Sequence, residues 1–222
     1  MSRGSFDQAL NDVNQEIIEL GSRTIQVLEK TKVALTNLDE DLAKQIYDED
    51  DLIDAKEIEI SEKCMNIIIR EQPIARDLRF LLTALKISSD FERICDHSAQ
   101  ITKLTRKLLK HNAGTLPGGV EEMFNTTLDL VRRIVKAYAT SDMDIALGVY
   151  EDDDRLDQAY KMMVKWIKSK IENNVDQVDQ YIDYLFISKY FERIGDRTNS
   201  IAKWIIYKEK GTIRHYYNMK NL

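Results

Sequence analysis

The sequence has few of the residues that interrupt regular structure, with 2 prolines and 8 glycines among 222 residues. Sandwiches and barrels of short β-strands need many more turn residues than this. Hydrophobic residues make up 43% of the chain and charged residues 32%, which suits helices with a packed core and solvated outer faces. We therefore expect an all-α fold with an ordered core rather than a disordered chain.

Cysteine is scarce too, and the two residues present, Cys64 and Cys95, belong to no spaced metal motif. Both lie in apolar helical patterns, which predicts small buried thiols. The lack of a disulfide framework favours a reducing compartment. The first residues form no apolar signal core, and no apolar stretch approaches the ~20 residues of a membrane span. We expect a soluble, cytoplasmic protein without direct membrane insertion.

Positive charge is in deficit, with 32 basic against 38 acidic residues and a net charge of −6. Nucleic-acid binding depends on clustered Lys and Arg, so no nucleic acid is expected as a partner. The acidic balance instead favours cations as ligands.

Catalytic motifs are missing from the pattern as well. None of the three histidines, His97, His111 and His215, has a Glu three residues before it, as a ferritin-like di-iron site requires. The chain shows no glycine-rich phosphate loop, no His-Glu-x-x-His and no recognisable nucleophile context. We expect no enzyme, and we expect His97 to be a surface residue beside Asp96.

The chain divides near its middle, where residues 111–119 hold one of the two prolines and three of the eight glycines. A helix cannot run through such a segment, because Pro lacks an amide proton and Gly adopts unusual φ angles. We predict a first domain over 1–112, a linker over 113–119 and a second domain over 120–222.

The two halves are copies of one unit. The hexapeptide at 91–96, Phe-Glu-Arg-Ile-Cys-Asp, recurs at 191–196 with Gly in place of Cys, and the acidic segment 50–54 recurs at 153–157. An internal repeat of this kind is stronger evidence for the architecture than any single motif. Apolar residues spaced three and four apart predict three helices in each half, hence two pseudo-symmetric three-helix bundles. The expected helices are 7–36, 38–70 and 73–109, then 119–140, 142–172 and 176–209, with Asn37 and Ser141 as N-caps.

The third helix of each half carries the core seam in alternating steps of four and three. The seam residues are Ile87, Phe91, Ile94, Ser98, Ile101, Thr105 and Leu108, and in the second half Ile187, Phe191, Ile194, Thr198, Ile201 and Ile205. The beginning of each of these helices is apolar on a second side, at Leu78, Leu81 and Leu85 and at Val178, Tyr181 and Leu185. This second face must be buried against the other repeat or against another subunit, and both remain open.

Four pairs of carboxylates are spaced i, i+4 at matching places in both halves. They are Asp50 with Asp54, Glu92 with Asp96, Asp153 with Asp157, and Glu192 with Asp196. Each pair destabilises an isolated helix by roughly 0.2–0.5 kcal/mol. A cation that neutralises them would offset this cost, and carboxylate oxygens suit hard metal ions. A solvated acidic face is the competing interpretation.

Helical geometry turns the acidic pair of the third helix outward from its own bundle, and it places Asp50 and Asp54 at the edge of their core stripe. We expect the site on the bundle surface, where two helix edges meet. Glu57 lies on the same side and is a further candidate ligand, whereas its counterpart is Tyr160. The two sites are then not equivalent.

Taken together, segments 50–57, 71–79 and 90–97 resemble the first repeat of the PhoU family, and 153–160 and 191–196 resemble its second. The resemblance covers nearly the whole chain in order. It implies two three-helix bundles and a cytoplasmic negative regulator of phosphate uptake and of the phosphate-starvation response. The implied partners are the ATPase of the phosphate transporter and a membrane sensor histidine kinase; we also expect a homodimer.

The family's acidic motifs imply a metal ion or a small metal cluster, of iron, manganese, magnesium or zinc. Carried over by position, its ligands are Asp50, Asp54, Glu92, Asp96, Asp153, Asp157, Glu192 and Asp196, to which the residue pattern adds Glu57. Two departures are visible: Cys95 replaces a glycine, and Asn173-Asn174 replaces the Gln72-Pro73 of the first repeat. The alternatives are a metal store or metalloenzyme without a signalling role, and a helical partner protein that binds no ion.

Overall fold

The computed structural model describes residues 3–111, 113–172 and 174–212, in which every regular element is helical. The elements are α1 (Arg3–Asn37), α2 (Glu40–Asp48), α3 (Asp50–Glu71), α4 (Ala75–Lys110), α5 (Gly118–Thr140), α6 (Met143–Ile171), a 3-10 turn η1 (Val175–Gln177) and α7 (Val178–Lys210). The all-α fold of two repeated helical bundles is confirmed. No helix of the described residues has a stretch long and apolar enough to cross a bilayer.

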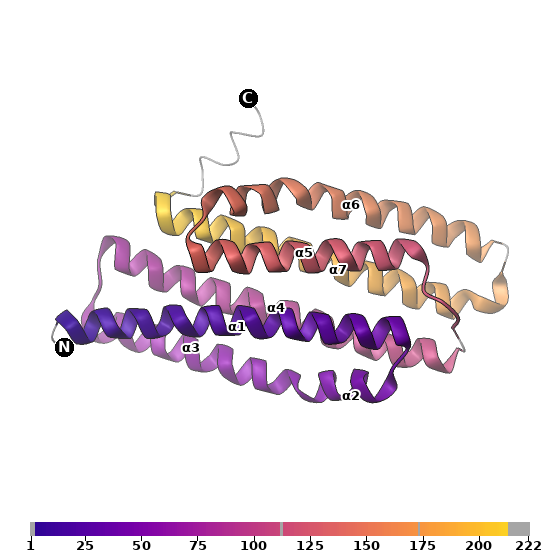
Figure 1. Ribbon diagram of the computed structural model, residues 1–222, viewed down its shortest axis with the longest axis horizontal. Helices are drawn as coiled ribbons and strands as arrows, with labels where there is room; N and C mark the ends of the chain where they lie inside the picture. The colour runs from indigo at the N-terminus through magenta and orange to yellow at the C-terminus, as the bar shows by residue number, and fades with distance from the viewer. Residues whose placement is uncertain (1–2, 112, 173, 213–222) are drawn as a thin grey trace, which may run out of the picture.

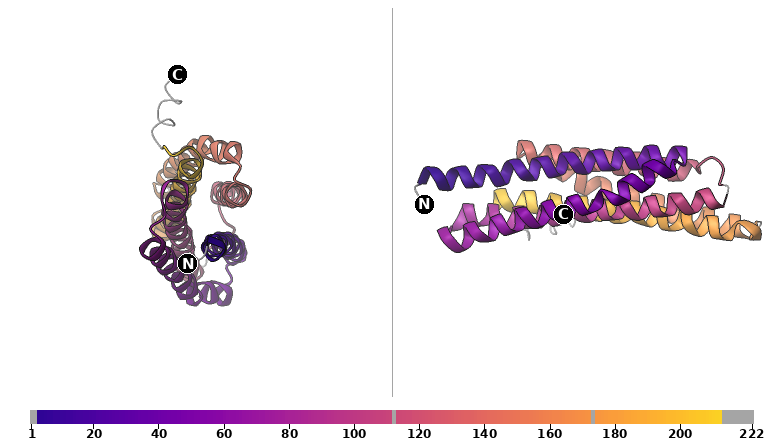
Figure 2. Two further views of the ribbon diagram at one scale, coloured as in Figure 1. Left: turned by 90° about the vertical axis from the view of Figure 1, so that its left-hand side faces the viewer. Right: turned by 90° about the horizontal axis from the view of Figure 1, so that it is seen from below.

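The helices run along the long axis of an elongated molecule (Figures 1 and 2). Helices α1–α4 form the first bundle and α5–α7 the second. The bundles lie side by side, with α4 packed along α7 and α1 along α5. Figure 1 shows α4 and α7 running in opposite directions, as a two-fold relation between the repeats requires.

The predicted seam is the core of both bundles. All thirteen seam residues are buried, including the polar Ser98, Thr105 and Thr198. Their hydroxyl groups donate to backbone carbonyls of their own helix, at 3.0 Å for Ser98 to Ile94 and 2.7 Å for Thr198 to Gly195. Small hydroxyl residues therefore fit the core without leaving a donor unpaired.

The two repeats share one continuous apolar cluster. At its centre α1 approaches both α4 and α5 so closely that a Cβ atom on Gly21 would lie 3.1 Å from the Phe91 ring and 3.1 Å from a Val135 methyl group. Phe124 of α5 packs edge-on against Phe191 of α7, with ring centroids 4.9 Å apart. On the second apolar side of the third helices, Leu81 and Tyr181 are buried in this cluster, and Leu85 and Leu185 pack against it. The predicted domain division stays a prediction; α4 ends at Lys110 and α5 begins at Gly118.

The predicted second helix is broken in two at Glu49, which was not expected. The Glu49 carboxylate accepts hydrogen bonds from Lys30 of α1 at 2.9 Å and from Gln45 at 2.6 Å, and these partners, Gln45 first, lower its pKa. Because of the break, Asp50 and Asp51 lie in the first turn of α3. Carboxylates are favoured there by the helix dipole.

Three predicted helix boundaries were wrong. Asn37 ends α1, and Asp39 caps α2 by accepting from the Leu42 amide at 3.0 Å. Ser141 is the left-handed C-cap of α5, while Asp142 caps α6. Pro73 precedes α4, which begins at Ala75. At α2 and α6, an aspartate one or two residues after the expected cap has the geometry that a capping carboxylate needs.

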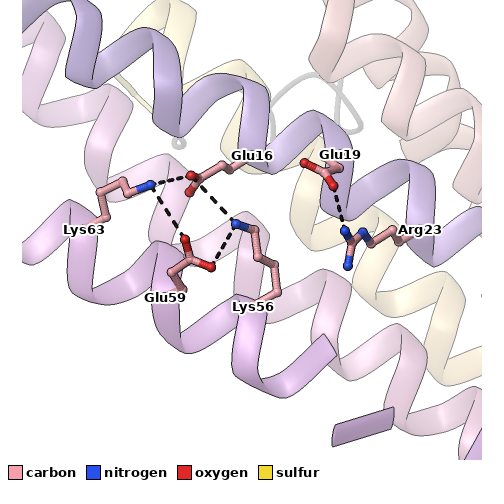
Figure 3. Close-up of polar contacts among 6 residues, drawn as sticks. All are labelled: Glu16, Glu19, Arg23, Lys56, Glu59 and Lys63. Atoms are coloured by element: carbon pink, nitrogen blue, oxygen red, sulfur yellow. Dashed lines mark hydrogen bonds and ion pairs between the residues drawn. The ribbon is translucent and has the colours of Figure 1, made fainter. Parts of the chain in front are cut away.

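An ion-pair network joins α1 to α3 (Figure 3). The Glu16 carboxylate, with 17% of its side chain exposed, contacts Lys63 and lies 3.7 Å from Lys56 Nζ. Glu59 bridges the same two lysines from the other side, at 3.0 Å and 3.9 Å. On α1, Glu19 pairs with Arg23 at 2.7 Å, and more than half of the Glu19 side chain is exposed.

The two glutamates of α1 provide a matched test of this network. We expect Glu16→Gln to lower the free energy of unfolding by roughly 1 kcal/mol, because two lysines lose a half-buried counter-charge. Glu19→Gln, which removes an exposed i, i+4 pair, is expected to cost less than about 0.5 kcal/mol. Urea unfolding followed by circular dichroism measures both, and equal losses would contradict the network.

Candidate functional site

The carboxylates of the first repeat come together where α3 begins beside the middle of α4. Asp50 and Asp54 project from α3, and Glu92 and Asp96 from α4. The pKa of Asp50 is raised to about 6, first by burial and then by the charges of Asp96 and Asp54. The pKa of Glu92 is likewise raised to about 7, first by burial, then by repulsion from Asp96 and Asp54, with a smaller contribution from Glu57. All five predicted acids of this repeat therefore share one electrostatic environment.

A polar pocket of about 410 Å³ lies at this edge, lined by acids of α2, α3 and α4. Its residues are Tyr47, Asp48, Asp50, Asp51, Asp96, Gln100 and Lys103. Lys103 is the cation of this pocket, and its Nζ lies 4.5 Å above the Tyr47 ring. Lys103 lowers the pKa of Asp50, but its effect is smaller than that of burial or of any of the neighbouring carboxylates. Its charge therefore does not neutralise the carboxylates.

In the second repeat, Asp157, Glu192 and Asp196 also come together. Burial raises the pKa of Asp196, followed by the charges of Glu192 and Asp157. Glu192 forms an ion pair with Lys189, one helical turn earlier on α7. The side chain of Asp153 lies outside the described residues, so the call on it stays a prediction.

Lys189 makes the two repeats electrostatically different. Its Nζ also lies 5.2 Å from the centroid of the Tyr160 ring, the residue that replaces Glu57. The first repeat has Ser89 at the matching position. Sequence reasoning missed this lysine, although its i, i+3 spacing to Glu192 is the signal of a helical ion pair.

In the described part of the chain, no three His, Cys, Asp or Glu side chains converge closely enough to enclose a metal ion. The predicted metal ligands therefore stay predictions. The donor set of the first repeat nevertheless suits a hard cation, since it consists of carboxylate oxygens from two helices. Burial first, and then repulsion between the carboxylates, raises the pKa values of Asp50 and Glu92, and together they outweigh the opposing charges of Lys103 and Arg93.

His97 is not the surface residue that was expected. It is half-buried beside Tyr190 of α7, with ring centroids 5.6 Å apart. Its pKa is lowered to about 4, first by burial and then by the charges of Arg193 and Arg197. The imidazole is thus neutral at pH 7 and belongs to the α4–α7 contact.

Both cysteines are buried free thiols, as predicted. Burial raises the pKa of each to about 12. The Cys95 thiol donates to the Thr24 hydroxyl at 3.6 Å, so the residue that replaces the family's glycine packs against α1.

Comparison with known proteins matches this chain to one family in both repeats. The PhoU domain model matches residues 17–105 and 120–205. A phosphate-specific transport system accessory protein PhoU homolog from Clostridium acetobutylicum is 32% identical over 208 residues, covering 93% of this chain and 95% of the relative. The PhoU protein of Escherichia coli (strain K12) is 28% identical over 208 residues, covering 94% of this chain and 86% of the relative.

Two solved structures have the same fold. The crystal structure of PhoU from Pseudomonas aeruginosa superposes with a TM-score of 0.88 at 28% identity, covering 93% of this chain and 100% of that chain. The phosphate transport system regulatory protein PhoU from Streptococcus pneumoniae gives a TM-score of 0.86 at 25% identity, covering 94% and 98%.

The unequal acidic sites predict a pH dependence of stability in metal-free protein. A raised carboxyl pKa means that the folded chain holds protons that the unfolded chain releases, so stability falls as pH rises from about 5 to 8. We expect Glu92→Gln to raise the free energy of unfolding by roughly 1 kcal/mol at pH 8, after solvent screening, and to flatten this slope.

Glu192→Gln is the matched control, because it removes a carboxylate that already pairs with Lys189. We expect it to leave stability at pH 8 unchanged or lower. Urea unfolding in EDTA at pH 5, 6, 7 and 8 measures both variants, and a stabilising effect of the same size in both would contradict the difference between the repeats.

Proposed function

The chain belongs to the PhoU family, and we propose that it acts in the cytoplasm as a negative regulator of phosphate uptake and of the phosphate-starvation response. The observation that carries this proposal is the match of both repeats to the PhoU domain, with relatives aligned over more than nine-tenths of the chain. Those relatives are phosphate-specific transport system accessory proteins. Their accessory and regulatory roles support binding, rather than catalysis, for this chain.

We further propose that the regulatory signal passes through protein contacts with the phosphate transporter ATPase and a sensor histidine kinase. The outer face of α3 supports this, since Ile58, Met65 and Ile69 lie along one stripe with 55%, 49% and 72% exposure. Phe186 of α7 is exposed at 51%. Apolar stripes on a charged helical surface are typical of contact sites for protein partners or for a second copy in a homodimer.

The first repeat is the stronger of the two proposed metal sites. Asp50, Asp54, Glu92 and Asp96, with Glu57 beside them, would hold the ion or cluster, and the cation would supply the positive charge that this edge needs. In the second repeat Lys189 already supplies a positive charge to Glu192. A metal bound at the first site would stabilise α3 against α4 by relieving the repulsion between their carboxylates.

Deletion of the gene tests the regulatory role. We expect phosphate-starvation genes to switch on in phosphate-rich medium when the gene is deleted, because the repressing contact is lost. A plasmid copy should restore repression. Transcript levels in high and low phosphate measure this, and unchanged expression in the deletion strain would contradict the proposed function.

Thermal unfolding with added metal tests the proposed site. Saturating Mn²⁺ or Fe³⁺ is expected to raise the Tm of the parent protein by roughly 5–10 °C, because an ion that binds only the folded state stabilises it. Asp50→Asn with Glu92→Gln should abolish most of the shift, whereas Asp157→Asn with Glu192→Gln should keep it. Equal loss in both double variants, or no shift in the parent, would overturn the assignment to the first repeat.

A further inference from the structure

A second polar pocket, of about 400 Å³, lies between α4 and α7, where the two repeats meet, and away from the α3 edge. We call it the α4–α7 pocket. Lys86, Ser89, Asp90 and Arg93 line it from α4, and Arg197, Ser200 and Trp204 line it from α7. On each helix these residues are spaced three and four apart, so each set occupies one face. Because α4 and α7 lie side by side in opposite directions, the two faces meet (Figure 1).

The pocket carries an excess of positive charge. Its three cationic side chains face a single carboxylate, Asp90, which is only 6% exposed. Asp90 accepts hydrogen bonds from Arg197 at 3.4 Å and from the Ser200 hydroxyl. Lys86 and Arg93 form no ion pair with any described residue, and the shielded Nε–H of Arg197 has no hydrogen-bond partner there. In a chain of net charge −6, uncompensated cations around a pocket call for an anion.

The chemistry of the lining selects among anions. Lys, Arg and Ser groups are donors that suit the oxygens of a tetrahedral oxyanion. Asp90 is different, because a carboxylate only accepts hydrogen bonds and repels an anion that has no proton to offer. Phosphate carries an O–H group near pH 7 and sulfate does not. Asp90 therefore favours phosphate over sulfate.

We propose that the α4–α7 pocket binds one inorganic phosphate ion, with Lys86, Arg93 and Arg197 as donors and Asp90 as acceptor for the phosphate proton. The identification of phosphate as the ligand in the cell rests on the proposed function; the binding chemistry rests on the pocket. The pocket occurs once per chain, because the repeat places Phe186, Tyr190 and Leu104 where the pocket has Lys86, Asp90 and Trp204. Since both repeats contribute residues, the bound ion would link α4 to α7.

Trp204 provides a direct reporter. The chain has 2 tryptophans, and the other, Trp166, lines a separate apolar groove between α5 and α6. In a Trp166→Phe protein, we expect sodium phosphate to change Trp204 fluorescence saturably, with one site per chain by calorimetry. EDTA throughout keeps metal-bound phosphate out of the measurement, and constant ionic strength removes general screening. Sodium sulfate is expected to bind roughly tenfold more weakly or worse.

Three variants separate the pocket from general charge effects. Lys86→Gln and Arg93→Gln should each weaken phosphate binding roughly tenfold, since each removes a charged donor that forms no ion pair with a described residue, and Gln is a good helix former. Arg23→Gln, which removes an exposed charge on α1, should leave it unchanged. Asp90→Asn should reduce the preference for phosphate over sulfate. Circular dichroism verifies that each variant is folded.

Three results would contradict the proposal that this pocket binds phosphate. These are no saturable signal with phosphate, equal affinity for sulfate in the parent, or unchanged phosphate affinity in Lys86→Gln with Arg93→Gln. Tighter binding of O-phosphoserine than of inorganic phosphate would assign the pocket to phosphomonoesters instead. If phosphate fails to bind while the intact gene still represses phosphate-starvation genes, the proposed function stands and the pocket assignment falls.

Discussion

The antiparallel packing of α4 against α7 is the constraint on which the rest of the structure depends. Each of these helices buries its seam, from Ile87 to Leu108 and from Ile187 to Ile205, inside its own bundle. Packed against each other, they bring the two repeats together, and the buried apolar residues of both repeats form one cluster. The charged side chains lie in the contact between α4 and α7 and at the edge that α4 shares with α3.

Charge of opposite sign is thereby sorted to different places. The acids of α4 face outward toward α3, where burial and mutual repulsion raise the pKa of Asp50 to about 6 and that of Glu92 to about 7. Lys86 and Arg93 of α4 and Arg197 of α7 meet in the α4–α7 pocket, around the buried Asp90. The duplication is not electrically symmetric, because Lys189 neutralises part of the second acidic set and has no counterpart in the first. Helix α4 thus contributes to both proposed sites, to the cation site together with α3 and to the anion site together with α7.

Much of this was predictable from sequence, because it depends on periodicity within one helix. The steps of four and three identified the buried seam, and the repeat identified two equivalent bundles. What failed depends on contacts between helices. The break at Glu49 is stabilised by Lys30 of α1, and the burial of His97 comes from Tyr190 of α7. The α4–α7 pocket joins residues about a hundred positions apart in the sequence, and no local pattern predicts that Asp90 lies beside Arg197.

The central proposal is that the carboxylates of α3 and α4 in the first repeat bind a cation. Anomalous diffraction from crystals of the full chain soaked in Mn²⁺ tests it most directly. We expect the strongest peak between α3 and α4, within bonding distance of carboxylate oxygens from both helices, and a weaker peak or none at the second repeat. No peak at the α3–α4 edge, or a stronger one beside Glu192, would contradict the account.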